Sequence, residues 1–248
     1  MSRVFVIIPA RYASRRLPGK PLLEIDGRPM IHHVWERAVL ALSTDAVAVA
    51  TDDLRVARVV ESFGGRAILT PSSCASGGDR VAAAMKVLMS EGERIDVIVN
   101  VQGDEPLLEP EAVLQVSSLV SPIAEGGLAP MATLARDLEQ EEAEISSVVK
   151  VVCDLKGYAL YFSRSPIGFD RGSEDRVLAR AHVGLYAYTP SFLERLANLR
   201  PTPLEMAEQL EQLRILEHGL PIAVGHTGWR AISVDTPEDL ERVRALAC

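Results

Sequence analysis

The stretch VFVIIPARYASRRLPGKPL, residues 4–22, joins an apolar run to a cationic loop. Its first five residues are β-branched or aromatic, which is typical of a buried strand. The prolines and the glycine that follow keep the next residues out of regular structure. Those residues carry four cationic side chains, Arg11, Arg15, Arg16 and Lys20. The whole chain has a formal net charge of −8, so any anion site that these cations form must be local.

Short β-branched runs alternate with helical patterns through the first half of the chain. The pattern predicts strands at 3–8, 46–51, 66–69 and 95–101, and helices at 29–40, 53–63, 79–90 and 109–118. Such βαβ repetition indicates a parallel sheet. Because ligands bind beyond the carboxyl ends of parallel strands, we expect the loops that follow three of them to share one face. These loops are 9–21, 70–79 and 102–108.

The second half of the chain has a different pattern. Residues 148–163 resemble a hairpin with a turn at 154–157, and 181–188 resemble another strand, which predicts a mixed-sheet sub-domain at about 150–220. Thr-Pro pairs with a following acidic residue predict a helix from 202 to about 218 and another from 236, the latter after a strand at 232–234. We therefore expect one α/β domain over residues 1–248 that carries this sub-domain.

Composition and missing motifs exclude several classes of protein. The pI near 5.2 argues against nucleic-acid binding, and no apolar stretch is long enough to span a membrane. The chain is therefore expected to be soluble and cytoplasmic, without a nucleic-acid or membrane partner. It has no GxxxxGK[ST] sequence, and no GxGxxG follows the first strand, which argues against P-loop and dinucleotide-binding folds.

Three features have both a chemical and a structural interpretation. The cationic loop has the arginine forks and the ammonium that bind a polyphosphate, although a solvated basic loop has the same composition. Asp104 follows an apolar strand and is a candidate ligand for magnesium, or the cap of a polar turn. Asp235 is either a second carboxylate at that site or simply the residue before a capped helix.

Seven segments in order resemble the 3-deoxy-manno-octulosonate (Kdo) cytidylyltransferase family, from residue 4 to about 244. They are IPARYASRRLPGKPL, ATDD, VNVQGDEPLL, KVVCDLKGYALYFSR, HVGLYAYTP, LEQLRILEHG and VDTPEDLERV. The resemblance implies a Rossmann-like, three-layer α/β/α nucleotidyltransferase fold with a mostly parallel central sheet and a mixed-sheet dimerisation insertion. It also implies a homodimer that uses Mg²⁺, CTP and Kdo, and makes CMP-Kdo and pyrophosphate for lipopolysaccharide biosynthesis.

The resemblance also assigns roles to individual residues. Those implied for catalysis are Arg16, Lys20, Asp104 and Asp235, of which the two aspartates would bind the metal. Those implied for CTP are Arg11, Ser14, Arg16, Lys20, Ser76, Gly77, Arg80 and Gln102. Those implied for the sugar acid are Arg164, His182, Tyr186, Glu211 and Gln212.

The chain departs from the family pattern at a few positions. Gly78 stands where the family usually has threonine in the cytosine loop, which puts base selectivity and the order of that loop in question. Gly168 and Ser233 also differ, so the 8-amino analogue of Kdo is an alternative substrate. A sialic-acid-like substrate and a catalytically silent nucleotide-binding protein are further alternatives.

Overall fold

The chain divides into two units in the computed structural model, which describes residues 2–14, 16–120, 129–168 and 178–247. The first unit comprises Met1–Ser117 and Ala231–Cys248, and the second comprises Ser118–Arg230. Both ends of the chain therefore contribute to the first unit. Within the described ranges, every helix is too short or too polar to cross a membrane.

The first unit is built on a parallel sheet. Its strands are β1 (Val4–Pro9), β4 (Val47–Thr51), β5 (Arg66–Leu69) and β6 (Val97–Asn100). They are paired in the order β6-β1-β4-β5, and every pair is parallel. The central strands are buried on both faces, as expected of a parallel sheet that helices cover on both sides. The predicted parallel sheet is thus confirmed.

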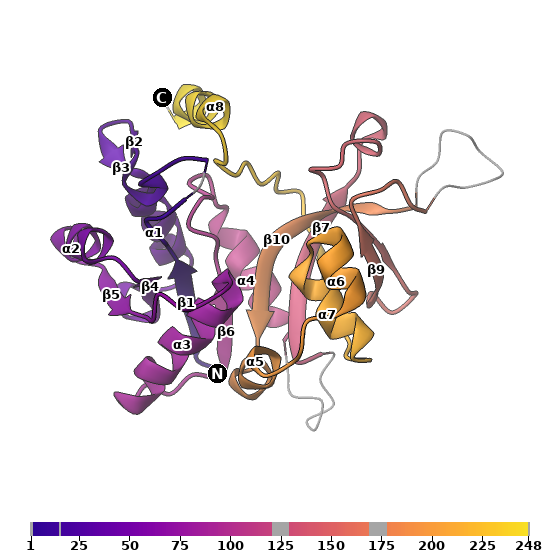
Figure 1. Ribbon diagram of the computed structural model, residues 1–248, viewed down its shortest axis with the longest axis horizontal. Helices are drawn as coiled ribbons and strands as arrows, with labels where there is room; N and C mark the ends of the chain where they lie inside the picture. Colours follow the sequence, from indigo (N-terminus) through magenta and orange to yellow (C-terminus); the bar gives the residue numbers. More distant parts are fainter. Residues whose placement is uncertain (1, 15, 121–128, 169–177, 248) are drawn as a thin grey trace. The chain divides into compact units, whose positions relative to one another are not determined.

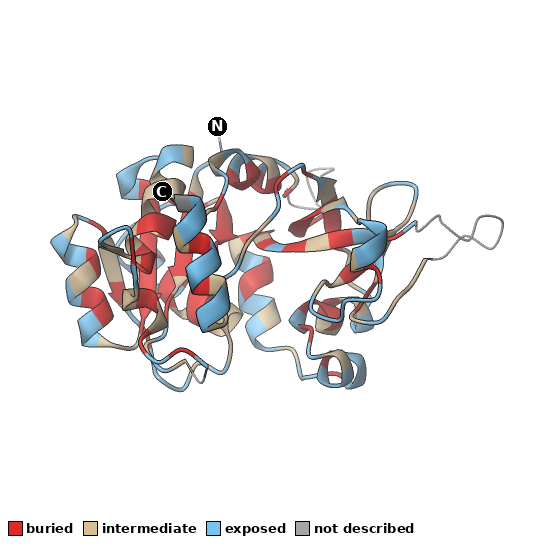
Figure 2. Ribbon diagram, turned by 90° about the horizontal axis from the view of Figure 1, so that it is seen from above, coloured by how far each residue is buried: buried red, intermediate tan, exposed pale blue. Residues whose placement is uncertain are grey.

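The helices of the first unit connect these strands or follow them. They are α1 (Met30–Ala41), α2 (Leu54–Ser62), α3 (Gly77–Ser90), α4 (Pro110–Ser118) and α8 (Pro237–Ala247). Both α1 and α3 pack on β1 and β4 (Figure 1). Buried residues lie along the strands and on one side of the covering helices (Figure 2). This apolar stripe is what makes each helix cover the sheet.

The order of the strands creates a switch point between β1 and β6. From β1 the chain passes through α1 and α2 to β4 and β5 on one side, and α3 then returns it to β6 on the other side. Right-handed crossovers place α3 on the opposite face of the sheet from α1 and α2. Ligands of such sheets bind where the strand order reverses. The loops after β1 and β6 begin at this point, which is therefore the expected ligand site.

A small apolar cluster attaches the end of the chain to its beginning. After the cationic loop come the short helix η1 (Lys20–Leu22) and a hairpin of β2 (Glu24–Ile25) and β3 (Arg28–Pro29). Leu17 and Ile25 from this region pack with Val234 and with Leu240 and Val243 of α8. The segment that carries Asp235 is therefore held beside the loop that carries Lys20.

The second unit contains a mixed sheet, as predicted. Its strands are β7 (Met131–Asp137), β8 (Lys150–Cys153), β9 (Ala159–Ser163), β10 (Arg180–Tyr188) and β11 (Ala223–His226). β10 pairs antiparallel with β7 and β8, β8 pairs antiparallel with β9, and β11 pairs parallel with β7. The helices are α5 (Pro190–Ala197), α6 (Pro203–Glu208) and α7 (Glu211–Glu217), and a short turn η4 (Gln140–Glu142) follows β7.

Two predictions of local structure are wrong. The helix expected from 202 to about 218 is two helices, because Gln209 adopts a left-handed backbone with φ 53° and ends α6. The strand expected at 232–234 is an irregular segment, although the Val234 N–H donates to the carbonyl of Asp104 over 2.9 Å. The sequence pattern also did not indicate β7, β11 or α5.

Candidate active site

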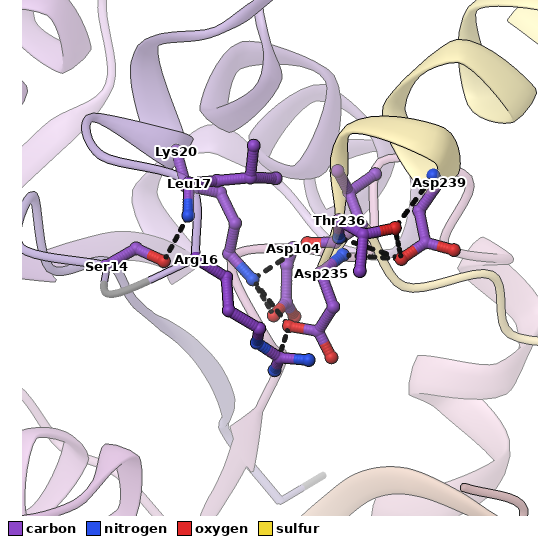
Figure 3. A network of polar contacts seen from close by, with 9 residues as sticks. Ser14, Arg16, Leu17, Lys20, Asp104, Asp235, Thr236 and Asp239 are labelled. Atoms are coloured by element: carbon purple, nitrogen blue, oxygen red, sulfur yellow. Dashed lines mark hydrogen bonds and ion pairs between the residues drawn. The ribbon is translucent and has the colours of Figure 1, made fainter.

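Lys20 is the centre of a charged cluster at the switch point. Gly19 adopts φ 71°, a backbone that favours glycine, and so turns the chain into η1 with Lys20 as its first residue. The Lys20 ammonium donates to Asp104 Oδ2 at 2.6 Å, to Asp235 Oδ1 at 3.1 Å and to the Val234 carbonyl at 2.8 Å (Figure 3). All three donors of the ammonium are therefore satisfied by groups of the site.

The two carboxylates come from opposite ends of the sequence. Asp104 follows β6, and Asp235 lies in the irregular segment before α8. The hydrogen bond from the Val234 N–H to the Asp104 carbonyl holds the two segments side by side. Beyond it, the carboxylate of Asp239 accepts from the backbone and the hydroxyl of Thr236, which fixes the turn into α8 (Figure 3). The structure thus brings together the two aspartates that the sequence predicted as metal ligands.

The other residues of the cationic loop lie around this cluster. Arg16 points to Asp235, with 3.0 Å between Nη2 and Oδ1, while 64% of its side chain is exposed (Figure 3). Ser14 accepts from the Leu17 N–H at 3.4 Å, and Arg11 is exposed at the start of the loop. Arg15 lies outside the described residues. Arg16 thus extends the charged cluster through its contact with Asp235.

Glu105 is a further acidic group beside the cluster, and the sequence analysis gave it no role. Burial, and the nearby charges of Asp104 and Asp235, raise the pKa of its carboxyl to about 8. Its Oε2 atom is buried without a hydrogen-bond partner among the described residues. These effects favour the protonated form of Glu105, which carries no charge.

The loop before α3 lies next to the residues that follow β1 and β6. Ser76 and Asp79 make a capping box at the start of α3, and Gly78 lies inside that first turn. A side chain at Gly77 would contact Pro9 and Gln102, because its Cβ would be 3.6 and 3.8 Å from their atoms. The expected approach of the three loops is therefore confirmed within this unit.

Arg80 of α3 connects the ends of two neighbouring strands. Its guanidinium is buried, donating to Thr70 Oγ1 at 2.6 Å and to Asp52 Oδ2 at 3.2 Å. Thr70 and Asp52 follow β5 and β4, so Arg80 fixes the ends of both strands. Gln102 donates to Asn100 Oδ1 at 3.3 Å. The sequence analysis missed the supporting roles of Asp52 and Asn100, whose contacts depend on the fold.

A polar group in the second unit gathers four of the five predicted sugar residues. His182 Nε2 is 2.9 Å from Thr133 Oγ1, and its ring centroid is 5.5 Å from that of Tyr186. The Tyr186 hydroxyl contacts Gln212 Oε1 at 3.4 Å. Burial, and then the charge of Glu211, raises the pKa of Tyr186. Gln212 Nε2 is buried and has no hydrogen-bond partner among the described residues.

Arg164, the fifth predicted sugar residue, lies at the end of α6. Its Nε donates to the Glu208 carbonyl at 2.8 Å, and its other nitrogens approach the carbonyls of Ser146 and Gln209 at 3.3 and 3.4 Å. The Glu208 carboxylate in turn accepts from the Arg164 N–H at 2.9 Å. Arg164 therefore caps the end of α6 in this structure, where its cation also complements the helix dipole.

The buried imidazole of His182 should make the folded protein less stable in acid. Burial lowers the pKa of its imidazole from 6.5 to about 3, so the folded protein keeps it neutral while the unfolded chain takes up a proton below pH 6.5. Stability is thus lost as the pH falls from 6.5 towards 3, by about 1–2 kcal/mol at pH 5. Urea unfolding at pH 7.5 and 5.0 measures this loss. His182→Gln should remove it and exposed His218→Gln should not; equal losses in both variants would contradict the assignment.

Comparisons with known proteins identify the family. Residues 5–222 match the family described as cytidylyltransferase. A 3-deoxy-manno-octulosonate cytidylyltransferase from Anaeromyxobacter sp. (strain Fw109-5) is 56% identical over 247 residues, which cover 99% of this chain and 97% of the relative. The chain belongs to the 3-deoxy-manno-octulosonate cytidylyltransferase family. The family resemblance found in the sequence is therefore confirmed.

Two further comparisons agree with this membership. A 3-deoxy-manno-octulosonate cytidylyltransferase from Myxococcus xanthus (strain DK1622) is 48% identical over 244 residues, covering 98% of this chain and 96% of the relative. The solved structure of a CMP:2-keto-3-deoxy-manno-octonic acid synthetase complexed with CTP superimposes with a TM-score of 0.87. It is 43% identical and covers 99% of this chain and 98% of the solved one. The predicted nucleotidyltransferase fold is therefore confirmed.

Proposed function

We propose that this chain transfers CMP from CTP to the anomeric 2-hydroxyl of Kdo and releases pyrophosphate. The product, CMP-Kdo, is the activated sugar for lipopolysaccharide biosynthesis. The main support for the proposal is that Lys20 contacts both Asp104 and Asp235 at the switch point of a cytidylyltransferase fold. The relatives named for this reaction match the chain over almost its full length, which supports the same chemistry. We propose that it takes place in the cytoplasm.

The aspartate pair suits a divalent metal. Asp104 and Asp235 direct one oxygen each at a single cation, the Lys20 ammonium, over 2.6 and 3.1 Å. The described residues contain no group of three or more His, Cys, Asp or Glu that could hold a metal. Two carboxylates that leave other positions to substrate phosphates are what Mg²⁺ usually receives from a protein. When bound there, Mg²⁺ would neutralise phosphate charge and lower the pKa of the attacking hydroxyl.

The remaining catalysis is positioning and charge neutralisation. The anomeric oxygen forms a bond to the α-phosphorus while the bond to the leaving pyrophosphate breaks in line with it, and the hydroxyl proton leaves to solvent. Arg16 and Lys20, together with Arg11 and Ser14 of the same loop, would bind the triphosphate and offset the charge that develops on pyrophosphate. This path needs no covalent enzyme intermediate.

The loop before α3 would bind the nucleoside. Ser76, Gly77 and Gln102 are brought together beside β1, and buried Arg80 holds the strand ends under them. Gly77 leaves room for a ligand to approach the backbone. Gly78 lies in an ordered helix turn, and this supports a defined conformation of the loop without the threonine hydroxyl.

The second unit would bind the sugar acid. His182, Tyr186 and Gln212 are in contact and Glu211 is next to them, so donors and acceptors for sugar hydroxyls converge there. Arg164 would reach the sugar carboxylate with the two nitrogens whose present contacts are longest, at 3.3 and 3.4 Å. This group lies within the predicted sub-domain at about 150–220.

The same sub-domain would form a homodimer. It exposes Leu160 by 63%, Leu178 by 60% and Met206 by 63%, and a dimer interface would remove such apolar surface from water. Analytical ultracentrifugation tests this part of the proposal, since a monomer at micromolar concentration would contradict it.

Pyrophosphate release tests the function directly. The purified protein is incubated with CTP and Mg²⁺ and one of three acids, namely Kdo, its 8-amino analogue or a nine-carbon sialic acid. We expect the highest kcat/KM with Kdo. Preference for the analogue or for the nine-carbon acid would change the substrate and keep the chemistry, whereas no release with any acid would support a silent nucleotide-binding protein.

A further inference from the structure

The cationic loop depends on contacts outside the aspartate cluster. Between β1 and η1 it contains Pro18 and the left-handed Gly19, and the described residues of this part have no regular structure of their own. Lys20 reaches both aspartates only if the preceding Gly19 keeps its present position. A flexible loop would have to be ordered each time that a nucleotide binds, and this ordering lowers affinity.

Tyr12 holds the part of the loop next to Lys20. The Tyr12 carbonyl accepts from the Gly19 N–H at 3.0 Å and from the Ser14 N–H at 2.9 Å. The Tyr12 ring lies against the same glycine, because a Cβ added to Gly19 would be 3.1 Å from the Tyr12 hydroxyl oxygen and 3.2 Å from two ring carbons. Main chain and side chain of one residue therefore fix the turn that leads into Lys20.

Arg55 holds Tyr12 from α2. Its guanidinium carbon lies 3.5 Å from the centroid of the Tyr12 ring, within the range of a cation–π contact. Asp53 binds the same guanidinium in a fork, with 2.9 Å from Nε to Oδ1 and 2.6 Å from Nη2 to Oδ2. Asp53 also caps α2 by accepting from the Arg55 N–H at 2.8 Å. A continuous chain of contacts thus runs from the start of α2 to the turn before Lys20.

We propose that Tyr12 and Arg55 are positioning residues that preorganise the cationic loop for CTP. This inference rests on the proposed function, in which that loop binds the triphosphate. Neither residue is among those described as contacting Asp104 or Asp235, so the two act through Gly19 and Lys20. Since preorganisation acts on binding, losing it raises the KM for CTP and leaves kcat and the KM for Kdo nearly unchanged.

Four variants of purified protein test the proposal. Tyr12→Leu removes the ring, and about a tenfold higher KM for CTP is expected. Arg55→Ala removes the cation, for which about a threefold rise is expected. Tyr12→Phe keeps the ring and should stay within about twofold of the wild type. Arg58→Ala removes another exposed charge from the same helix, and it should have no effect.

Combined substitutions and direct binding complete the test. If Tyr12 and Arg55 act through one contact, the double variant raises the KM for CTP by less than the product of the single effects. Equilibrium CTP binding should weaken in parallel with KM. An effect of Tyr12→Phe as large as that of Tyr12→Leu, or a fall in kcat with unchanged KM for CTP, would overturn the proposal.

Lys20→Ala separates this proposal from the proposed function. Weaker CTP binding in Lys20→Ala together with normal binding in Tyr12→Leu and Arg55→Ala would overturn the positioning role alone. Normal CTP binding in Lys20→Ala would overturn the assignment of the loop to the triphosphate and the positioning role with it. Absence of pyrophosphate release from the wild type would overturn the proposed reaction itself.

Discussion

Asp104→Asn is expected to lower kcat for pyrophosphate release by about three orders of magnitude at saturating CTP and Kdo. The change removes one negative charge from the aspartate pair but keeps the size of the side chain. Asparagine is a poor ligand for Mg²⁺ compared with a carboxylate, and its amide cannot form the 2.6 Å ion pair with Lys20. The rate is measured by a coupled pyrophosphate assay over a range of Mg²⁺ concentrations.

The control for Asp104 lies a few residues further along the same loop. Glu109 is exposed, so Glu109→Gln removes one charge nearby without touching the pair and should stay within about twofold of the wild type. Asp235→Asn should act in the same direction as Asp104→Asn, because both carboxylates meet the same ammonium. Asp104→Asn with the rate and Mg²⁺ dependence of the wild type would contradict the proposed metal site.

Lys150→Met is expected to give the largest loss of stability, about 3–5 kcal/mol. Lys150 has 0% of its surface exposed, and its ammonium donates to the carbonyls of Ile145, Val148 and Arg164 at 3.0, 2.8 and 2.5 Å. Methionine fills the same space but has no donor, so these carbonyls lose their shared partner. Urea unfolding followed by circular dichroism measures the loss, which corresponds to a Tm lower by about 10 °C.

Lys156→Met is the matched control for this substitution. Lys156 lies on the exposed turn between β8 and β9, so its loss should change the free energy of unfolding by less than about 0.5 kcal/mol. Lys150→Met with the stability of the wild type would show that the three carbonyls find other partners. Because one of them belongs to Arg164, the folded fraction of Lys150→Met should also bind Kdo more weakly.

Local periodicity predicted the alternating strands and helices of the first unit as far as α4, but not the irregular segment at 232–234. The apolar run at residues 4–8 and the βα alternation after it were sufficient, because a buried strand and an amphipathic helix each have their own residue period. The rule that ligands bind beyond parallel strands then placed the cationic loop and Asp104 together correctly. The family resemblance supplied the chemistry, which spacing alone had left open between a metal site and a capped turn.

Contacts between residues that are distant in the sequence became visible only in the folded protein. Asp235 lies beside Asp104 because Val234 and α8 pack on the hairpin after the cationic loop, and this packing is not visible in the local pattern. The break at Gln209 and the strand β11 depend likewise on partners from other segments. For the same reason Arg164 caps α6, and Arg55 lies on the ring of Tyr12. Local periodicity reports which side of an element is buried, whereas pairing between distant segments depends on the shape of the packed core.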